Sequence, residues 1–154
     1  MEFEIAPYRS LDFTPVCMLE RINEGCGYPA AVFVRQMEEL APSTFFVARC
    51  GGKVTGFAVG AVAGSGNRDA WVLRLRVLPG YQRKGIGSAL MSRLIQALAS
   101  SGARLVFLSV SPSNMAARGL YGKLGFTTVR EGENYFGPGE DRLILCRDIP
   151  GSGP

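Results

Sequence analysis

The most distinctive chemistry-bearing segment is Gln82-Arg83-Lys84-Gly85-Ile86-Gly87, which lies between a predicted strand and a predicted helix. A helix N-terminus presents N–H groups without partners and the positive end of the helix dipole. Glycines let a bulky anion approach the backbone, and two adjacent cations add charge there. The segment therefore predicts a cradle for a phosphate or pyrophosphate. It lacks the P-loop ending and the full dinucleotide fingerprint, so a glycine-rich turn with solvated cations is the alternative.

A second candidate lies on the last predicted helix. At about 100° per residue, Asn114, Arg118 and Tyr121 fall on one narrow stripe. A separate apolar stripe, which we expect to face the core, consists of Ala117, Leu120 and Leu124. Asn114 and Tyr121 should therefore point together off the packed side. Gly119 and Gly122 are unfavourable inside a helix, which indicates that something approaches it closely. The alternative is that Tyr121 only packs and Asn114 only caps the helix.

The elements that must position these residues follow from the hydrophobic pattern of the 154-residue chain. We expect strands at 2–8, 44–49, 53–62, 69–78, 105–110, 126–130 and 142–147, and helices at 14–25, 29–40, 85–100 and 112–125. On the fourth strand, one face should carry Trp71, Leu73, Leu75 and Val77. The fifth strand is nearly all apolar, which is typical of a strand covered on both faces. Without repeats or linkers, residues 1–150 should form a single α/β domain, followed by a frayed tail at 151–154.

Composition excludes several kinds of chemistry. The chain has no histidine, which excludes a Ser-His-Asp triad, a Cys-His pair and a histidine-containing zinc site. Scattered cysteines without a CxxC pair predict reduced thiols, no metal site and a cytoplasmic protein: Cys17, Cys26, Cys50 and Cys146. No apolar run approaches the ~20 residues of a membrane helix, so no membrane partner is expected. The net charge of +4 suits nucleic acid and an anionic cofactor equally. No long basic run supports a nucleic-acid partner.

Together, the two segments resemble those of a known family. Residues 76–87 (Arg-Val-Leu-Pro-Gly-Tyr-Gln-Arg-Lys-Gly-Ile-Gly) are similar to the acyl-CoA-binding motif of the GNAT superfamily of N-acetyltransferases. Residues 113–126 look like the second motif of that family, and one helix and one strand separate the two motifs, as in the family. The predicted order β-α-α-β-β-β-α-β-α-β-β matches over nearly the whole chain. The resemblance implies the GNAT fold, an α/β fold with a mixed central sheet of about seven strands flanked by about four helices.

The resemblance also implies a site for acetyl-CoA. In the family, main-chain amides of the first motif hold the pyrophosphate, and here these belong to Arg83, Lys84, Gly85, Ile86, Gly87 and Ser88. The pantetheine arm pairs like an additional strand with the strand before the motif, here near Leu75 and Val77. Asn114 corresponds to the asparagine that reaches the pantetheine. Tyr121 corresponds to the tyrosine that protonates the departing thiolate.

The implied reaction is direct attack of a primary amine on the thioester in a ternary complex. The oxyanion that forms needs a donor, for which we expect a main-chain N–H near Val77. A tyrosine with a pKa near 10 stays protonated at neutral pH and can supply a proton to the thiolate. A covalent acyl-cysteine is the rival route, but none of the four cysteines lies in either motif.

The general base is left open by the sequence. Relatives that acetylate protein N-termini often carry a glutamate on the fifth strand, where this chain has Leu108 and Ser109. An α-amino group has a pKa of about 7.7–8.0, against about 10.4 for lysine, so ordered water could suffice. Other carboxylates, each either a base or an ordinary surface acid, are Glu24, Asp69, Glu131, Glu133 and Asp141.

The segment 134–141 (Asn-Tyr-Phe-Gly-Pro-Gly-Glu-Asp) joins the last two strands. It resembles a segment of N-terminal protein acetyltransferases, including the ribosomal-protein alanine type. The resemblance implies that Tyr135 and Phe136 wall the acceptor site, and the alternative is a turn whose aromatics cover the sheet edge. The leading prediction is an acetyl-CoA-dependent N-acetyltransferase of a protein or peptide amine, acting as a monomer or homodimer. A small-molecule amine acetyltransferase and a non-catalytic acyl-CoA-binding regulatory domain are the alternatives.

Overall fold

The computed structural model describes residues 1–22 and 27–150. The helices are α1 (Phe13–Glu20), α2 (Tyr28–Leu40), α3 (Ile86–Ser100) and α4 (Met115–Lys123). The strands are β1 (Glu4–Pro7), β2 (Phe45–Cys50), β3 (Lys53–Val62), β4 (Asp69–Val77), β5 (Leu105–Val110), β6 (Thr127–Gly132) and β7 (Arg142–Asp148). These strands form one sheet in the order β1-β2-β3-β4-β5-β7-β6. The predicted mixed sheet of seven strands with four helices is confirmed over the described residues.

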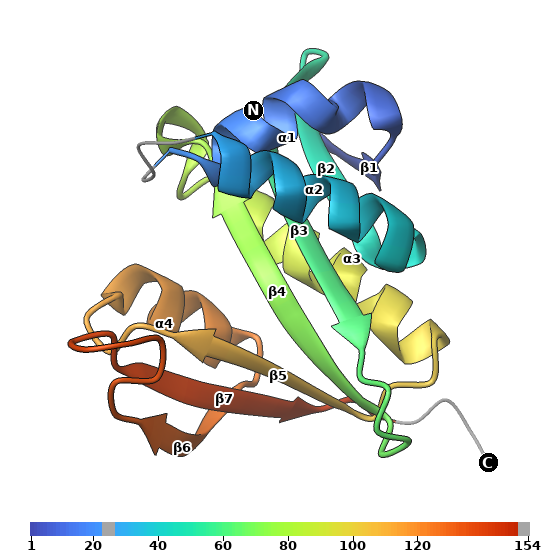
Figure 1. Ribbon diagram of the computed structural model, residues 1–154. Coiled ribbons are helices and arrows are strands. Elements are labelled where there is room, and N and C mark those ends of the chain that lie inside the picture. The colour runs from blue at the N-terminus through green and yellow to red at the C-terminus, as the bar shows by residue number, and fades with distance from the viewer. Residues whose placement is uncertain (23–26, 151–154) are drawn as a thin grey trace.

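The N-terminal half of the sheet is covered on both faces (Figure 1). One core lies under α1 and α2 and includes Val16, Val34, Phe45 and Phe57. A second core lies between α3 and the opposite face and includes Phe46, Ala58, Leu90 and Leu94. Because side chains of a strand alternate between its faces, Phe45 and Phe46 enter opposite cores.

Glycines on β3 bring α3 close to the sheet. A Cβ at Gly56 would lie 3.1 Å from Leu90 Cδ1 and 2.9 Å from the Arg76 carbonyl oxygen. A Cβ at Gly60 would lie 3.4 Å from Leu94 Cδ1. Larger residues at these two positions would push the helix outward. The glycines therefore set the position of α3 and of the turn that precedes it.

A buried ion pair between Asp12 and Arg49 ties the start of α1 to β2, with Arg49 Nη2 2.7 and 2.8 Å from the two carboxylate oxygens. We expect Arg49→Met to lower the free energy of unfolding, measured in urea, by about 3–5 kcal/mol, because a buried carboxylate loses its counter-charge. Arg35, which pairs with Glu38 at the surface, provides the matched control. Arg35→Met should change that free energy by less than about 1 kcal/mol. Equal losses of unfolding free energy in the two variants would show that burial of the Asp12–Arg49 ion pair does not determine its contribution.

The sheet divides between β4 and β5. These two strands run parallel and pair where Asp69–Trp71 meets Leu105–Phe107. Beyond this point they diverge, so that α4, β5, β6 and β7 form a second block beside the first (Figure 1). The divergence opens a cleft whose walls are the facing edges of β4 and β5.

A bulge in β4 changes which face its side chains use. Leu73 has no partner on β3, because Val72 and Arg74 pair with two consecutive residues of that strand. Leu73 packs in the core under α1 and α2, whereas Leu75 and Val77 pack in the opposite core. The prediction that the four apolar residues of this strand share one face is therefore wrong, since a bulge shifts the alternation by one residue.

Two other predictions also need correction. The first helix ends at Glu20 rather than at Gly25, which lies outside the described residues. The expectation that both faces of β5 are covered is also wrong. Its buried side chains alternate with partly exposed ones, and the buried set is Val106, Leu108 and Val110. The other face of β5 belongs to the cleft side of the sheet, where Phe107 stacks on Trp71 at a centroid distance of 5.3 Å.

Candidate active site

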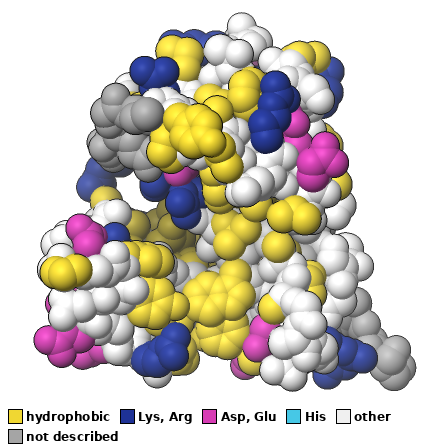
Figure 2. All heavy atoms as spheres, in the orientation of Figure 1, with side chains coloured by type: hydrophobic (Ala, Val, Ile, Leu, Met, Phe, Trp, Pro, Cys, Tyr) yellow, Lys and Arg dark blue, Asp and Glu magenta, His cyan; other side chains and the backbone are white. Residues whose placement is uncertain are grey.

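A cavity of about 1040 Å³ occupies the cleft between β4 and β5. Figure 2 shows it as a hollow between the two blocks, with hydrophobic and basic side chains around it. Both strands, the start of α3, α4 and the segment before β7 contribute to its wall. Among the described residues that line it, five are Arg or Lys and none is Asp or Glu: Arg74, Arg76, Arg83, Lys123 and Arg142.

Most of the residues that the sequence singled out meet in this cavity. Those that line it are Leu75, Val77, Arg83, Gly85, Gly87, Ser88, Asn114 and Tyr121. Lys84 and Ile86 do not line it: the side chain of Ile86 is buried in the core, and Lys84 is exposed. The prediction for these two residues concerned their main-chain amides and stays a prediction.

The turn before α3 presents main-chain donors to the cavity. Gly85 caps the helix in the left-handed conformation, with φ 86°, and Arg83 is also left-handed, with φ 60°. The Ala89 amide donates to the Gly85 carbonyl at 3.0 Å, so the N–H groups of residues 86–88 precede the first bonded turn. A Cβ at Gly85 would meet nothing within 4 Å, so the backbone conformation is what requires glycine. This free helix end can hold an anion.

The edge of β4 that faces the cavity has free peptide groups. The Leu78 amide, just after β4, points toward β3 and donates to the Thr55 carbonyl at 2.8 Å. Successive peptide groups of a strand point to alternate edges, so the N–H groups of Val77 and Leu75 point away from β3, into the cleft. The Gln82 side chain reaches this edge and donates to the Val77 carbonyl at 3.1 Å. The edge can therefore pair with an extended ligand as a strand would.

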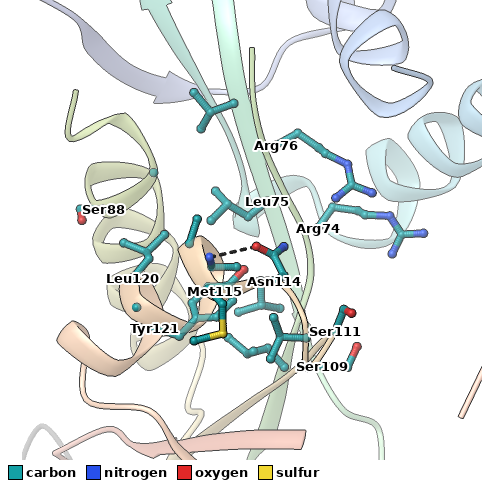
Figure 3. Close-up of a pocket in the computed structure, with 18 of the residues that line it drawn as sticks. Arg74, Leu75, Arg76, Ser88, Ser109, Ser111, Asn114, Met115, Leu120 and Tyr121 are labelled. Carbon is teal, nitrogen blue, oxygen red and sulfur yellow. Dashed lines mark hydrogen bonds between the residues drawn. The ribbon is translucent and has the colours of Figure 1, made fainter. Parts of the chain in front are cut away.

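Asn114 and Tyr121 both reach the cavity, although not in the predicted way. Asn114 is the N-cap of α4, and its Oδ1 accepts from the Ala117 amide at 3.1 Å (dashed in Figure 3). Its backbone is not helical, so the stripe calculation does not apply to it. Tyr121 is buried in the core, and its ring packs edge-on against Phe126 at 5.9 Å. The prediction that Tyr121 points off the packed side is therefore wrong.

Tyr121 has the electrostatic surroundings of a neutral proton donor. Burial raises the pKa of its phenol above the usual value, and the nearby Arg76 guanidinium offsets part of that rise. The hydroxyl consequently stays protonated at neutral pH.

The two glycines of α4 are not approached closely by any described residue. A Cβ at Gly119 or Gly122 would meet no atom within 4 Å. Gly119 instead borders the open cavity.

None of the described candidate bases lines the cavity. The described candidates that do not line it are Asp69, Glu131, Glu133 and Asp141, while Glu24 lies outside the described residues. Leu108 and Ser109, the two residues at which the resemblance led us to look for a glutamate, both line it. Of the two aromatic residues expected at the acceptor site, Phe136 lines the cavity, whereas Tyr135 packs over Gly132.

Sequence reasoning missed a charged cluster at the same cavity. Arg74 and Arg76 line it, and their Nε atoms lie 2.7 and 3.8 Å from the two oxygens of Glu20 on α1. The available signal was the run Leu-Arg-Leu-Arg-Val in an otherwise apolar strand. A charged side chain on such a strand needs an opposite charge or contact with solvent, and these two arginines have both.

The described cysteines take no part in the cavity. Cys17, Cys50 and Cys146 carry free thiols that lie outside the cavity lining, and Cys26 is not among the described residues. Within residues 1–22 and 27–150, no helix has both the length and the apolar character required to cross a membrane.

Comparison with known proteins agrees with this geometry. A model of the acetyltransferase (GNAT) family matches residues 14–126. An N-alpha-acetyltransferase of Sulfurisphaera tokodaii is 31% identical over 158 aligned positions, covering 96% of this chain and 94% of that protein. The crystal structure of the ribosomal-protein-S18-alanine N-acetyltransferase from Escherichia coli is similar at a TM-score of 0.82 and 28% identity, covering 99% of this chain and 97% of that one.

A protein from Salmonella typhimurium, solved with its cofactor acetyl-CoA, shares the fold at a TM-score of 0.80 and 20% identity, covering 100% of this chain and 98% of that one. The family match spans more than two thirds of the chain, including both motifs and the start of α3. The chain therefore belongs to the GNAT acetyltransferase family and is an N-acetyltransferase of that type.

Proposed function

We propose that this chain transfers the acetyl group of acetyl-CoA to the α-amino group of a protein or peptide. The observation that carries the proposal is the placement of Tyr121. It lines the same cavity as the start of α3 and the arginine-bearing part of β4. The relatives from Sulfurisphaera tokodaii and Escherichia coli, an N-alpha-acetyltransferase and a ribosomal-protein-S18-alanine N-acetyltransferase, support the same acceptor class.

The residues of the cavity fit acetyl-CoA. The helix N-terminus at residues 86–88 and the Arg83 side chain would hold the phosphates, through donors and positive charge. The free peptide groups of Leu75 would pair with the pantetheine arm, which leaves the neighbouring Val77 N–H for the thioester carbonyl. Asn114 retains its side-chain NH₂ as a donor, because only its Oδ1 is used in capping α4. The open space beside Gly119 leaves room for the same arm.

Bound acetyl-CoA would supply an acetyl group activated as a thioester, with the CoA thiolate as the leaving group. The Val77 N–H points into the cleft and offers a donor where negative charge develops on the carbonyl oxygen. The Tyr121 hydroxyl is protonated at neutral pH and gives its proton to the leaving sulfur. The surrounding core, including Phe126, keeps the tyrosine ring in one orientation.

The absence of a carboxylate among the described lining residues favours an α-amine over a lysine side chain. At pH 7.4 about a quarter of an α-amine is neutral, against about one in a thousand lysine amines. Positive charge from Arg74 and Arg76 lowers the pKa of an amine bound nearby and raises the neutral fraction further. Water can then accept the remaining proton, and a dedicated base is not required.

The proposal is tested by following acetyl-CoA consumption with matched acceptors. One peptide is offered with a free N-terminus and again with a blocked N-terminus and an internal lysine, beside a panel of small amines. We expect turnover with the free N-terminus and at least about a hundredfold lower kcat/KM with the blocked peptide, from the difference in neutral amine. Turnover of small amines alone would contradict the proposed acceptor. Tight acetyl-CoA binding without any turnover would point to a regulatory domain.

A further inference from the structure

The part of the cavity away from α3 carries positive charge that the proposed binding of acetyl-CoA does not use. Arg74 and Arg76 leave β4 on the side opposite Leu75, and Ser109 of β5 and Ser111, just after this strand, lie on that side too (Figure 3). The Arg74 guanidinium lies over the Phe33 ring of α2 at 4.7 Å. We call the two side chains of Arg74 and Arg76 the arginine wall. It faces the space left for the acceptor.

Glu20 anchors the arginine wall without neutralising it. Its side chain is 3% exposed, and its Oε1 accepts from Arg74 Nε at 2.7 Å. Arg76 Nε lies 3.8 Å from Oε2, which accepts no hydrogen bond from the described residues. One carboxylate thus faces two guanidinium groups, so the cluster keeps an excess of positive charge. The arginine side chains are 39% and 43% exposed, which leaves their outer nitrogens accessible from the cavity.

We infer that the arginine wall recognises a carboxylate on the acceptor, so that the preferred substrate is a peptide with an acidic residue close behind its free N-terminus. This inference rests on the proposed function and specifies its acceptor. Guanidinium groups bind carboxylates through charge-assisted, often paired hydrogen bonds. Among the described lining residues no acid competes for them from inside the cavity.

The position of the acidic residue follows from the strand geometry. On this proposal the acceptor peptide runs from Tyr121 toward Arg76, which is close enough to act on the pKa of Tyr121. An extended chain advances about 3.3 Å per residue. Side chains at the second or third position of the peptide can therefore reach Arg76 or Arg74. A lysine at the same position would meet like charge, which disfavours binding.

The test uses three peptides that differ only at the second residue: Ala-Glu, Ala-Gln and Ala-Lys, each followed by the same sequence. Affinity is measured by calorimetry in the presence of a non-transferable acetyl-CoA analogue, and kcat/KM is measured separately. We expect Glu to bind about tenfold more tightly than Gln, the range of one charge-assisted hydrogen bond, and Lys to bind most weakly. The advantage of Glu should fall as salt is raised.

Arg76→Gln should remove most of the preference for Glu over Gln. Arg76 is the better site for substitution, because replacing Arg74 would leave buried Glu20 without its closest partner. The matched control is Arg93→Gln on α3, which removes the same charge from an exposed position outside the cavity lining. It should leave the preference unchanged, and thermal melting checks that both variants fold.

Equal affinity for Glu and Gln peptides, or a preference that survives Arg76→Gln, would overturn the inference while leaving N-terminal acetylation intact. A clear binding preference without acetylation of any peptide would retain the inference and overturn the proposed function. Loss of preference in both Arg76→Gln and Arg93→Gln would also overturn it, because the effect would then come from overall charge.

Discussion

Replacing Tyr121 by phenylalanine should lower kcat by about 10²- to 10⁴-fold, the usual contribution of a positioned general acid. The Kd for acetyl-CoA should stay within about twofold, since the hydroxyl acts on the leaving sulfur rather than on the phosphates. The ring is retained, so its packing against Phe126 and the melting temperature should change little. Steady-state kinetics and calorimetry with the same peptide measure the two quantities.

The pH dependence gives a second check on the same residue. Because burial raises the pKa of Tyr121 above its usual value, kcat of the wild type should not decline as the pH rises from 7 to about 9. A decline with a midpoint below about 9 would assign the acid to another group. Tyr135→Phe is the matched control, because Tyr135 is exposed and outside the cavity lining. Equal effects of the two substitutions, or unchanged kcat in Tyr121→Phe, would remove Tyr121 as the acid.

The second large effect is expected from Gly87→Glu, which should raise the Kd for acetyl-CoA by at least about a hundredfold. A carboxylate about 4 Å from a phosphate costs several kcal/mol even at an effective dielectric constant of about 20. The new Cβ would lie 3.3 Å from the end of the Leu120 side chain, which can shift by a few tenths of an ångström. The variant should therefore fold, which thermal melting would verify.

Two control variants separate charge from shape at this position. Gly87→Gln adds nearly the same volume without the charge, so it should weaken binding less than Gly87→Glu. Gly80→Glu adds the same charge in the adjacent exposed turn, outside the cavity lining, where a Cβ meets nothing within 4 Å. It should have a small effect that disappears at high salt. Normal acetyl-CoA affinity in Gly87→Glu would show that the phosphates bind elsewhere.

The start of α3 was predictable from sequence because its causes are local. A glycine in the left-handed conformation at residue 85 and an amphipathic helix after it are backbone preferences that nearby residues set. The strands of the N-terminal half were predictable for the same reason, since the hairpin of β2 and β3 turns at Gly51 and Gly52, both with positive φ.

The site at β4 was less predictable because it depends on pairing with other strands. The bulge at Leu73 exists only where β4 meets β3, and it reverses the faces of the residues that follow. The divergence of β4 from β5 likewise has no local signal, although it creates the cavity and frees the Val77 amide. The burial of Tyr121 follows from its packing in the core beside Phe126, which cannot be calculated from the helix alone.

By itself, the sequence determined the order of the elements, the turn at residues 82–88 that we propose holds an anion and, through two motifs, the resemblance to acetyltransferases. Short-range backbone preferences and hydrophobic periodicity encode these features, so they can be recognised without a fold. Only the tertiary structure decided that Glu20 meets Arg74, 54 positions away, and that no described carboxylate lines the cavity. Such encounters depend on packing between distant elements, which determines whether a charged side chain is paired, buried or free to bind a ligand.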